Sequence, residues 1–381
     1  MNNTYLFGAG ASCAAGIPAT NGMVKEIYQK LKEAHFVWPQ IGEAIDLVIA
    51  GIKFNKTIAD SNPFVEIDIE EIYATLLELS ERNSNRLSPF IGSWSEKVNA
   101  VDQLGLKNRA NHVVAQLEHD MQEISRNVSM ANGRSTNIYL GGFRKALDDV
   151  FRIIDNEADY SNFDQAASYM LAILIQIVWI EKAESISYLK KFIESSKVNP
   201  LWIASLNYDN TIELTAQECG ISFDVGLDKQ AIGVKFDSEA PIKLAKLHGS
   251  VNWLLNENLT IDVQSKPVSN PALIFGLSNK LRVEGPYLDL LLSFRDRLSN
   301  TKILNIYGYS FRDPHINYLI LSWLSRSQDV KICVVDLALS VEEILERLES
   351  SLGKGRSLFR APVLDRIEVN NVPIESWLNP S

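Results

Sequence analysis

The sequence has few of the residues from which metal sites and disulfide frameworks are built. Its 381 residues include three cysteines, Cys13, Cys219 and Cys333, which are far apart and form no Cys-x-x-Cys pair. A four-cysteine zinc site therefore cannot be made from this chain, and so scattered a set does not predict disulfides. We expect no metal. Histidine is also scarce, with five copies, so the position of each one is informative.

An excess of positive charge is also lacking. The chain has 37 Lys and Arg against 47 Asp and Glu, a net charge of −10, and no dense basic run, so we do not expect direct nucleic-acid binding. The N-terminus lacks the features of a signal peptide. The most apolar stretch, residues 169–180, is too short to span a bilayer and predicts a buried helix. We therefore expect a cytoplasmic protein without membrane contact.

The spacing of apolar residues changes along the chain. From about residue 35 to 195 it is helical, most clearly in residues 67–83, 112–127, 139–155 and 163–183. After residue 198, short β-branched runs predict strands at 201–206, 243–247, 272–275, 302–308 and 331–336. Helical patterns separate the last three runs, and this alternation is typical of a doubly wound parallel sheet.

The first residues resemble a further strand of that sheet. Residues 4–8 are apolar and precede a helical pattern at 21–34, but the helical middle of the chain offers the strand no neighbours. We therefore predict an α/β, Rossmann-like doubly wound sheet made by residues 1–34 and 198–381. Residues 35–197 would then be a large helical insertion, which agrees with a length that exceeds one ordinary domain.

A glycine-rich turn, GAGASCAAGIP, follows the first predicted strand at residues 8–18. Gly8 and Gly10 would let the backbone approach a pyrophosphate closely, with the amides of Ala11, Ser12 and Cys13 directed at it from a helix N-terminus. A tight turn without a ligand is the alternative. The chain has no GxxxxGK[ST] motif, so we do not expect a nucleoside-triphosphatase site.

Polar residues follow two later strands. In SLNYDNTIEL, Asn210 and Glu213 have the spacing of a capping box, which leaves Asn207 and Asp209 in a strand-to-helix turn. His248 follows the next run. Ligands of open α/β sheets bind at this carboxyl edge, and histidine suits proton transfer near neutral pH. The alternatives are turn chemistry for the first pair and a buried, hydrogen-bonded histidine. By contrast, Asp313-Pro314 predicts only a helix start, with His315 outside the site.

Together these residues resemble the sirtuin family. Residues 8–18 are similar to its nucleotide loop, 207–209 to its Asn-x-Asp motif and 247–249 to its catalytic histidine motif. Residues 272–276 and 308–317 resemble later family segments, the latter in the form found in sirtuin-like NAD hydrolases of bacterial antiviral defence. The chain departs from protein deacylases: it has no zinc cysteines, Ala19-Thr20-Asn21 follows GIP, and Leu206 replaces a glutamine.

The resemblance implies an NAD+ glycohydrolase that releases nicotinamide and ADP-ribose as an effector of abortive infection. Asn207 and His248 would be catalytic, the first orienting ribose and water and the second acting as general base. Asp209 would grip the nicotinamide carboxamide. The other expected NAD-binding residues are Gly8, Ala9, Gly10, Ser12 and Pro18 in the first loop, Gly308 and Ser310 toward the adenosine, and Asp336, whose alternative is a turn carboxylate.

The resemblance also implies partners. We expect a homo-oligomer, with NAD as substrate and a HerA-type P-loop ATPase as a possible partner. Two other readings stay open: an NAD-dependent deacylase that has lost its zinc, and a subunit that senses NAD or ADP-ribose without turnover.

Overall fold

The computed structural model describes residues 3–35, 39–60, 67–82, 97–98, 101, 161–228, 231–275, 285–326, 328–350 and 365–378, without the side chains of residues 20–21, 31–35 and 57–60. The chain divides into two compact units. The first contains residues 1–30, 66–74 and 170–381, and the second contains residues 31–65 and 75–169. The sheet and all predicted site residues belong to the first unit.

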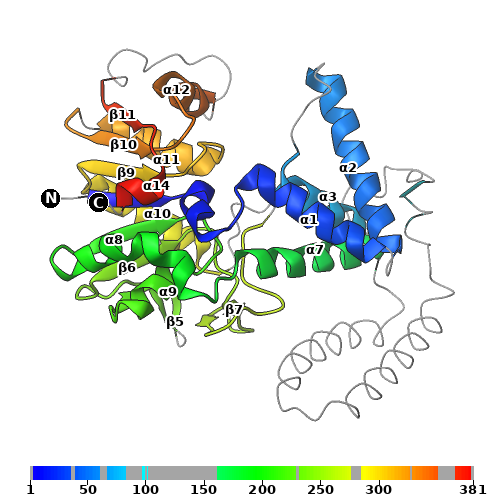
Figure 1. Cartoon of the computed structure of the whole chain (residues 1–381), viewed down its shortest axis with the longest axis horizontal. Helices are drawn as coiled ribbons and strands as arrows, with labels where there is room; N and C mark the ends of the chain where they lie inside the picture. The colour runs from blue at the N-terminus through cyan, green and yellow to red at the C-terminus, as the bar shows by residue number, and fades with distance from the viewer. Residues whose placement is uncertain are drawn as a thin grey trace, which may run out of the picture. The chain divides into compact units, whose positions relative to one another are not determined.

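A seven-stranded sheet forms the centre of the first unit (Figure 1). All of its paired strands run parallel, which confirms the predicted α/β, Rossmann-like fold. In spatial order the strands are β11 (Ile367–Asn370), β10 (Lys331–Val335), β9 (Ile303–Tyr307), β1 (Asn3–Phe7), β2 (Leu201–Ser205), β6 (Ile242–Lys246) and β3 (Phe223–Asp224). The N-terminal strand β1 pairs with β2 and β9, so it finds its neighbours in the C-terminal half as predicted.

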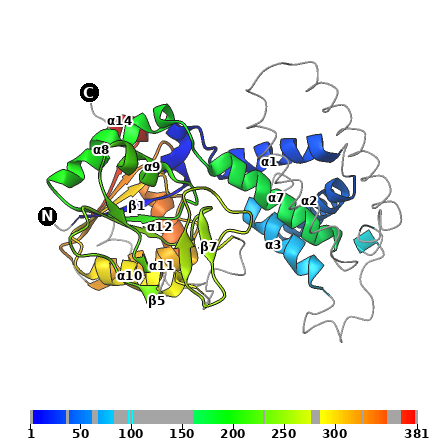
Figure 2. The ribbon, with the colours of Figure 1, turned by 90° about the horizontal axis from the view of Figure 1, so that it is seen from below.

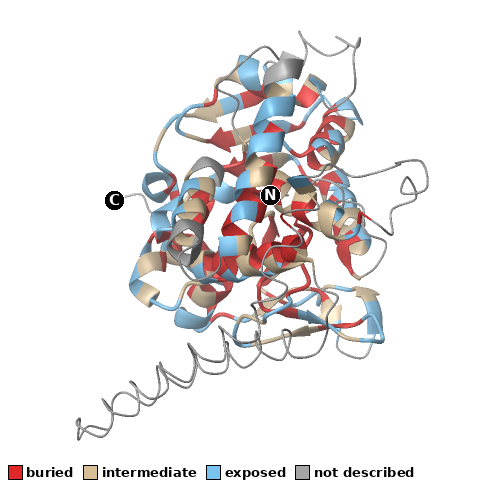
Figure 3. Ribbon diagram, turned by 90° about the vertical axis from the view of Figure 1, so that its right-hand side faces the viewer, coloured by how far each residue is buried: buried red, intermediate tan, exposed pale blue. Residues whose placement is uncertain are grey.

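Helices cover both faces of this sheet because successive side chains of a strand point to opposite sides. Leu6 enters the core on one face with α10 (Tyr287–Ser299), α11 (Pro314–Arg326) and α12 (Val341–Ser350). Phe7 enters the core on the other face with the 3₁₀ helix η3 (Ala183–Leu189), α8 (Lys190–Glu194), α9 (Thr211–Glu218) and α14 (Ile374–Leu378). Figure 2 shows α8, α9 and α14 opposite α10 and α11, and Figure 3 shows buried residues gathered between these layers.

The described part of the middle of the chain is helical, as its periodicity predicts. The described helices of this region are α2 (Pro39–Asp60), α3 (Ile69–Ser80) and α7 (Asn162–Val178), and the helical pattern before it, at 21–34, forms α1 (Thr20–His35). The helices predicted at 112–127 and 139–155 lie outside the described residues. Residues 183–197 were expected in the insertion, but they pack on the sheet because Tyr188, Phe192 and Ile193 join its core.

Among the described residues, no single helix has the length and apolarity to cross a membrane. Helix α7 and the segment Ala183–Lys197 meet these two criteria only as a pair, bent by 69°.

Residues 272–275 were predicted as a strand of the sheet, and this prediction is wrong. Only Leu273 forms an isolated antiparallel bridge, to Gly249, and Ile274 donates to the His248 carbonyl at 2.9 Å. The sheet position beside β6 belongs to β3 instead. Two antiparallel hairpins that the sequence analysis missed stand outside the main sheet: β4 (Leu227–Asp228) with β5 (Ala231–Val234), and β7 (Trp253–Leu255) with β8 (Ile261–Val263).

The strand order creates a switch point between β1 and β9. After β1 the chain adds β2 and β6 on one side, then crosses and adds β9, β10 and β11 on the other. The loops after β1 and β9 therefore leave the sheet as neighbours from opposite ends of the sequence. In open α/β sheets a ligand crevice forms at such a point.

Candidate active site

The glycines of the first loop are required by the protein's own backbone. A Cβ on Gly8 would lie 2.7 Å from the Gly308 carbonyl oxygen, and one on Gly10 would lie 2.8 Å from the Gly308 Cα. Gly308 itself has φ +60°, and a Cβ there would collide with the backbone of Gly10 and Ala11. Each of these positions therefore needs glycine because the loops after β1 and β9 pack backbone against backbone.

The amides of this loop are largely engaged within the protein. Gly8 donates to the Tyr307 carbonyl, Gly10 to the Gly308 carbonyl and Ala11 to the Gly8 carbonyl, each at 2.9 Å. The helix that follows, η1 (Ala9–Ala15), is a 3₁₀ helix of 7 residues that ends at Gly16 in the left-handed region. Of the three amides that were expected to face a phosphate, those of Ala11, Ser12 and Cys13, the Ala11 amide is therefore already bound to a carbonyl oxygen. For Ser12 and Cys13 the expectation stays a prediction.

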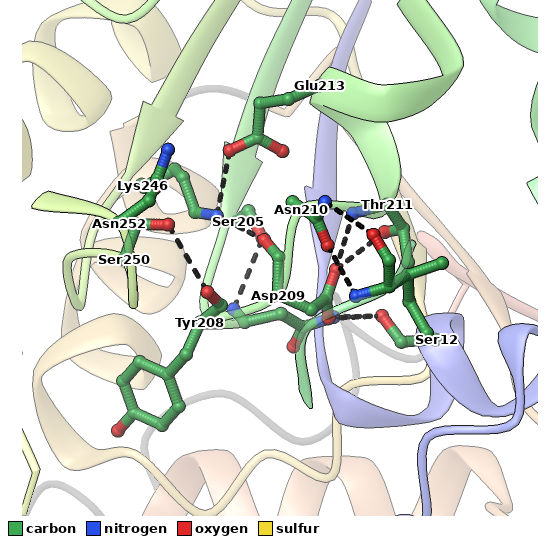
Figure 4. Close-up of polar contacts among 12 residues, drawn as sticks. Ser12, Ser205, Tyr208, Asp209, Asn210, Thr211, Glu213, Lys246, Ser250 and Asn252 are labelled. Carbon is green, nitrogen blue, oxygen red and sulfur yellow. Dashed lines mark hydrogen bonds and ion pairs between the residues drawn. The ribbon is translucent and has the colours of Figure 1, made fainter. Parts of the chain in front are cut away.

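Asn207, Ser12 and Asp209 form one directed hydrogen-bond chain between the ends of β1 and β2. Asn207 donates from Nδ2 to the Ser12 Oγ at 2.9 Å, and this hydroxyl donates to the Asp209 Oδ2 at 2.6 Å. Figure 4 shows Ser12 beside Asp209. A second Nδ2 hydrogen bond reaches the Gly8 carbonyl at 2.9 Å. Because the carboxylate accepts the Ser12 proton, the Ser12 oxygen must accept from the amide, and this sets the orientation of Asn207. Among the described residues, none donates to the Asn207 Oδ1.

Asp209 points into the protein and holds the start of α9. Asp209 is 5% exposed, and its Oδ1 accepts from the Thr211 amide at 3.0 Å and from the Thr211 hydroxyl at 2.6 Å. With Ser12 on the other oxygen, the carboxylate already has a partner on each side. The residue that was expected to grip a ligand carboxamide therefore serves first to join the loop after β1 to α9.

The helix predicted after Asp209 is present, but the predicted capping box is wrong. Asn210 occupies the N-cap position of α9 without a side-chain cap hydrogen bond. Its side chain binds the backbone of Ile180 instead, accepting from the amide and donating to the carbonyl at 2.9 Å each. The Asp209 carboxylate accepts from the Thr211 amide in its place, and Glu213 forms an ion pair with another residue.

That partner is Lys246, a buried lysine that the sequence analysis missed. It is 1% exposed at the end of β6 and lies 2.9 Å from the Glu213 Oε1 (Figure 4). Its ammonium also donates to the Asp209 carbonyl, so it supports the turn that carries Asn207 and Asp209. A lysine inside the apolar run PIKLAKL was the available signal, because buried lysines are found with a charged partner.

Tyr208, between the two predicted site residues, anchors the same turn. Its hydroxyl donates to the Ile274 carbonyl at 2.7 Å and contacts the Glu70 Oε1 at 3.1 Å. Burial, reinforced by the negative charge of Glu70, raises the pKa of Tyr208 well above its ordinary value. The hydroxyl is therefore a neutral donor, and its role is to fix the loop.

His248 lies beside this turn and is paired with Asp313. Its Nε2 is 3.2 Å from the Asp313 Oδ2, and its ring centroid is 6.5 Å from that of Tyr208. Gly249 follows in the left-handed region with φ +81°, where a Cβ would collide with the Ala272 carbonyl oxygen. Residues 272–274 pack against the loop of His248, and this close packing requires glycine at position 249.

The remaining predicted ligand residues have structural partners or lie at the margin of the loop. Asp336 accepts from the Ala338 and Leu339 amides at 2.9 and 3.1 Å, the turn arrangement named as its alternative. The Ser310 carbonyl accepts from Arg347 at 2.8 Å. Ala9 is exposed, and Pro18 is half-buried.

Cys13 is exposed in the first loop. Partial burial of the thiol, with Glu375 and Asp336 adding negative charge, raises its pKa above the ordinary value, despite an opposing hydrogen bond from Ala19. Since a thiolate is the reactive form, this shift does not favour a nucleophile.

Some of the predicted site residues contact one another directly, and others do so only through intervening residues. Residues from the loops after β1 and β2 bind one another directly, whereas His248 reaches them through Tyr208 and the 308–313 loop. Two cavities border the described residues. One of about 400 Å³ is lined by Phe311 and Arg312 of the loop after β9 and by Arg347, and another of about 390 Å³ borders Thr301 and Val330 at the opposite edge of the sheet. No group of three or more metal-ligating side chains occurs in the described part of the chain.

A family model described as a SIR2-like domain matches residues 202–351. The match covers β2, the Asn207–Asp209 turn, His248 and the strands β9 and β10, and it indicates NAD-related activity in general. It does not extend to the glycine loop at residues 8–18. No curated protein matches the chain.

Proposed function

From a SIR2-like domain as the premise, we propose that this protein hydrolyses NAD at the bond between nicotinamide and ribose. The observation that supports this proposal most strongly is the hydrogen-bond chain from Asn207 through Ser12 to Asp209, between the carboxyl ends of the neighbouring strands β1 and β2. It joins two motifs that are 195 residues apart and leaves one amide oxygen of Asn207 without a donor among the described residues.

Cleavage of the bond between nicotinamide and ribose does not need a general acid. Cleavage passes through an oxocarbenium-like state, and nicotinamide leaves as a neutral molecule, so no leaving-group proton is needed. The site must orient the ribose and a water and accept one proton. The Asn207 Oδ1 suits the first task because its orientation is set by Ser12. His248 suits the second because imidazole is the side chain that most often transfers protons in general acid–base catalysis.

Asp209 receives a different role in this proposal from the one that the family resemblance implies. Its carboxylate is buried and holds Ser12 on one oxygen and Thr211 on the other. We infer that it preorganises Asn207 through Ser12, while backbone and other groups of the crevice bind the nicotinamide. Preorganised hydrogen bonds of this kind lower the reorganisation needed in the transition state.

The test is to incubate the purified protein with NAD and no peptide and to measure free nicotinamide and ADP-ribose. His248→Ala should lower the rate by about 10²–10⁴-fold, the usual cost of removing a general base. His315→Ala is the matched control, because this half-buried histidine lies in the first turn of α11 and contributes only its backbone amide to Asp313. Equal rates for wild type and His248→Ala would remove His248 from the mechanism.

Two further arms separate the alternatives. Nicotinamide release that depends on an added acyl-lysine peptide would favour a zinc-free deacylase. Tight NAD binding without product over long incubation would favour a sensing subunit. Neither alternative has a specific structural observation in its favour.

For the biological role, we propose an effector of abortive infection that depletes NAD when a virus infects the cell. A free NAD hydrolase would harm its host, so control by self-assembly or by a HerA-type ATPase is part of the proposal. Expression with and without a neighbouring ATPase gene, followed by co-purification and size analysis, tests both partners. A monomer with no bound ATPase and full activity would contradict this form of control.

A further inference from the structure

Asp313 connects two structural tasks through its two carboxylate oxygens. Its Oδ1 accepts from the amides of His315 and Ile316, at 2.8 and 3.3 Å, and so caps α11. Its Oδ2 lies 3.2 Å from the His248 Nε2. The residue is 5% exposed, and each contact uses a different carboxylate oxygen. The sequence predicted only the first of these tasks.

The backbone around Asp313 is held firmly. Tyr309 accepts a hydrogen bond from the Asp313 amide at 3.2 Å and donates to the Asn317 Oδ1 at 2.9 Å. Asn317 in turn donates to the Phe311 carbonyl at 2.8 Å. Phe311 is buried and has φ +54°, a conformation that a bulky residue adopts only when its surroundings impose it. This loop therefore presents Asp313 in one position.

The position of Asp313 at the start of α11 favours a carboxylate. Two amides at the N-terminus of a helix of 13 residues favour a negative charge on the carboxylate. The same charge acts on Tyr309, whose pKa is raised well above its ordinary value by burial and then by Asp313. An anion that accepts from Nε2 requires a proton on that nitrogen. Among the described residues, the other ring nitrogen, Nδ1, has no hydrogen-bond partner.

We propose that Asp313 is the positioning residue of His248: it holds the proton on Nε2 and thereby makes Nδ1 the basic nitrogen of the site. This inference rests on the proposed NAD hydrolysis. During the reaction Nδ1 accepts one proton from the attacking water or from a ribose hydroxyl, and the ring becomes an imidazolium. The Nε2 proton stays between the ring and Asp313, which stabilises the new charge. The proton on Nδ1 is later released to solvent, so NAD and water yield nicotinamide, ADP-ribose and one proton.

The first experiment needs no turnover. Long-range proton–nitrogen correlation spectra of protein labelled with ¹⁵N-histidine report which ring nitrogen carries the proton. The chain has five histidines, and the spectrum of a His248→Gln variant assigns the signal of interest. When the His248 ring carries a single proton, we expect that proton on Nε2. A single proton on Nδ1 in the wild-type protein would overturn the inference whether or not the protein hydrolyses NAD.

The second experiment uses Asp313→Asn. Asparagine keeps an oxygen that can cap α11 but removes the charge, so the fold should persist while the proton of His248 redistributes between the two nitrogens. We expect kcat for nicotinamide release to fall by about 10²–10⁴-fold with a much smaller change in KM, as for other orienting carboxylates. Unchanged kcat or an unchanged tautomer would overturn the proposal.

Asp224→Asn is the matched control. Asp224 is half-buried and also binds backbone amides, those of Gly226 and Asp237, but it lies at the edge strand β3. It should leave both the His248 tautomer and kcat unchanged. If the protein releases no nicotinamide at all, the proposed function fails, and with it the catalytic part of this inference. The tautomer measurement then still decides whether Asp313 positions the ring.

Discussion

The buried ion pair between Lys246 and Glu213 gives the sharpest test of how the Asn207–Asp209 turn is held. Lys246→Met removes the cation but keeps a side chain of similar length. It leaves Glu213, whose side chain is 10% exposed, with an uncompensated charge, and it leaves the Asp209 carbonyl without its donor. The variant therefore measures how much the loss of one buried charge lowers the free energy of unfolding.

The magnitude follows from the contact distance. At 2.9 Å the attraction of two unit charges is about 6 kcal/mol with an effective dielectric constant of about 20. Desolvation of both groups offsets most of this gain, so the pair as a whole contributes little to stability. Removal of one partner forfeits the attraction but keeps the desolvation cost of the other. We therefore expect Lys246→Met to lower the free energy of unfolding by about 3–5 kcal/mol.

Equilibrium unfolding in urea, followed by circular dichroism and tryptophan fluorescence, measures this change. The double variant Lys246→Met/Glu213→Gln removes both charges and should recover about 2–3 kcal/mol of the loss. Lys243→Met is the matched control: Lys243 lies on the same strand, and its ammonium donates to the Ser238 carbonyl at 2.8 Å near the surface. It should cost about 1 kcal/mol or less.

Two results would refute this reasoning. A cost below about 1 kcal/mol for Lys246→Met would mean that Glu213 finds solvent or another donor easily. A double variant no more stable than Lys246→Met would mean that the unpaired carboxylate is not the source of the loss. Recovery of stability without recovery of NAD binding is compatible with the structure, because the Asp209 carbonyl still lacks its donor.

The other predictions concern the first loop. Gly308→Ala should destabilise the protein by about 3 kcal/mol or more, because a left-handed φ adds to a collision with the loop after β1. Gly16→Ala, at φ +89° with nothing within 4 Å of its Cβ, should cost only about 1 kcal/mol, and equal melting temperatures for the two variants would contradict the close approach of the loops. Because burial raises the pKa of the Cys13 thiol, its thiolate fraction at neutral pH is small. In a Cys219→Ser/Cys333→Ser background, its alkylation by iodoacetamide should be slower than that of free cysteine at pH 7 and should rise steeply with pH, whereas rapid reaction at pH 7 would show the opposite shift.

The contacts of the site also show which residue roles implied by the family resemblance fit this protein. The match to the SIR2-like domain covers Asn207, Asp209 and His248, yet the structure assigns these residues different surroundings. The amide oxygen of Asn207 is held in one orientation, whereas both carboxylate oxygens of Asp209 accept hydrogen bonds from Ser12 and Thr211. His248 is paired with Asp313. A motif therefore carries the residue types, while the contacts decide which of them faces a ligand.

The sequence by itself determined the fold class, most of the parallel strands and the two loops that meet at the switch point. These features depend on local patterns: β-branched runs, helical periodicity and glycines that permit a tight turn. The same local logic failed at residues 272–275, where an apolar run looks like a strand but bridges only at Leu273. An apolar pattern records that a segment is buried, not which edge of a sheet is open to receive it.

Only the tertiary structure decided the partners of the polar groups. Asn210 and Glu213 have the spacing of a capping box, yet each binds a residue at least 30 positions away, Ile180 and Lys246. The same holds for His248 and Asp313, which approach only because the loops after β6 and β9 leave one edge of the sheet. A buried polar atom takes whichever donor or acceptor the packing brings within reach, and this choice depends on strand order and loop path, which local sequence does not specify.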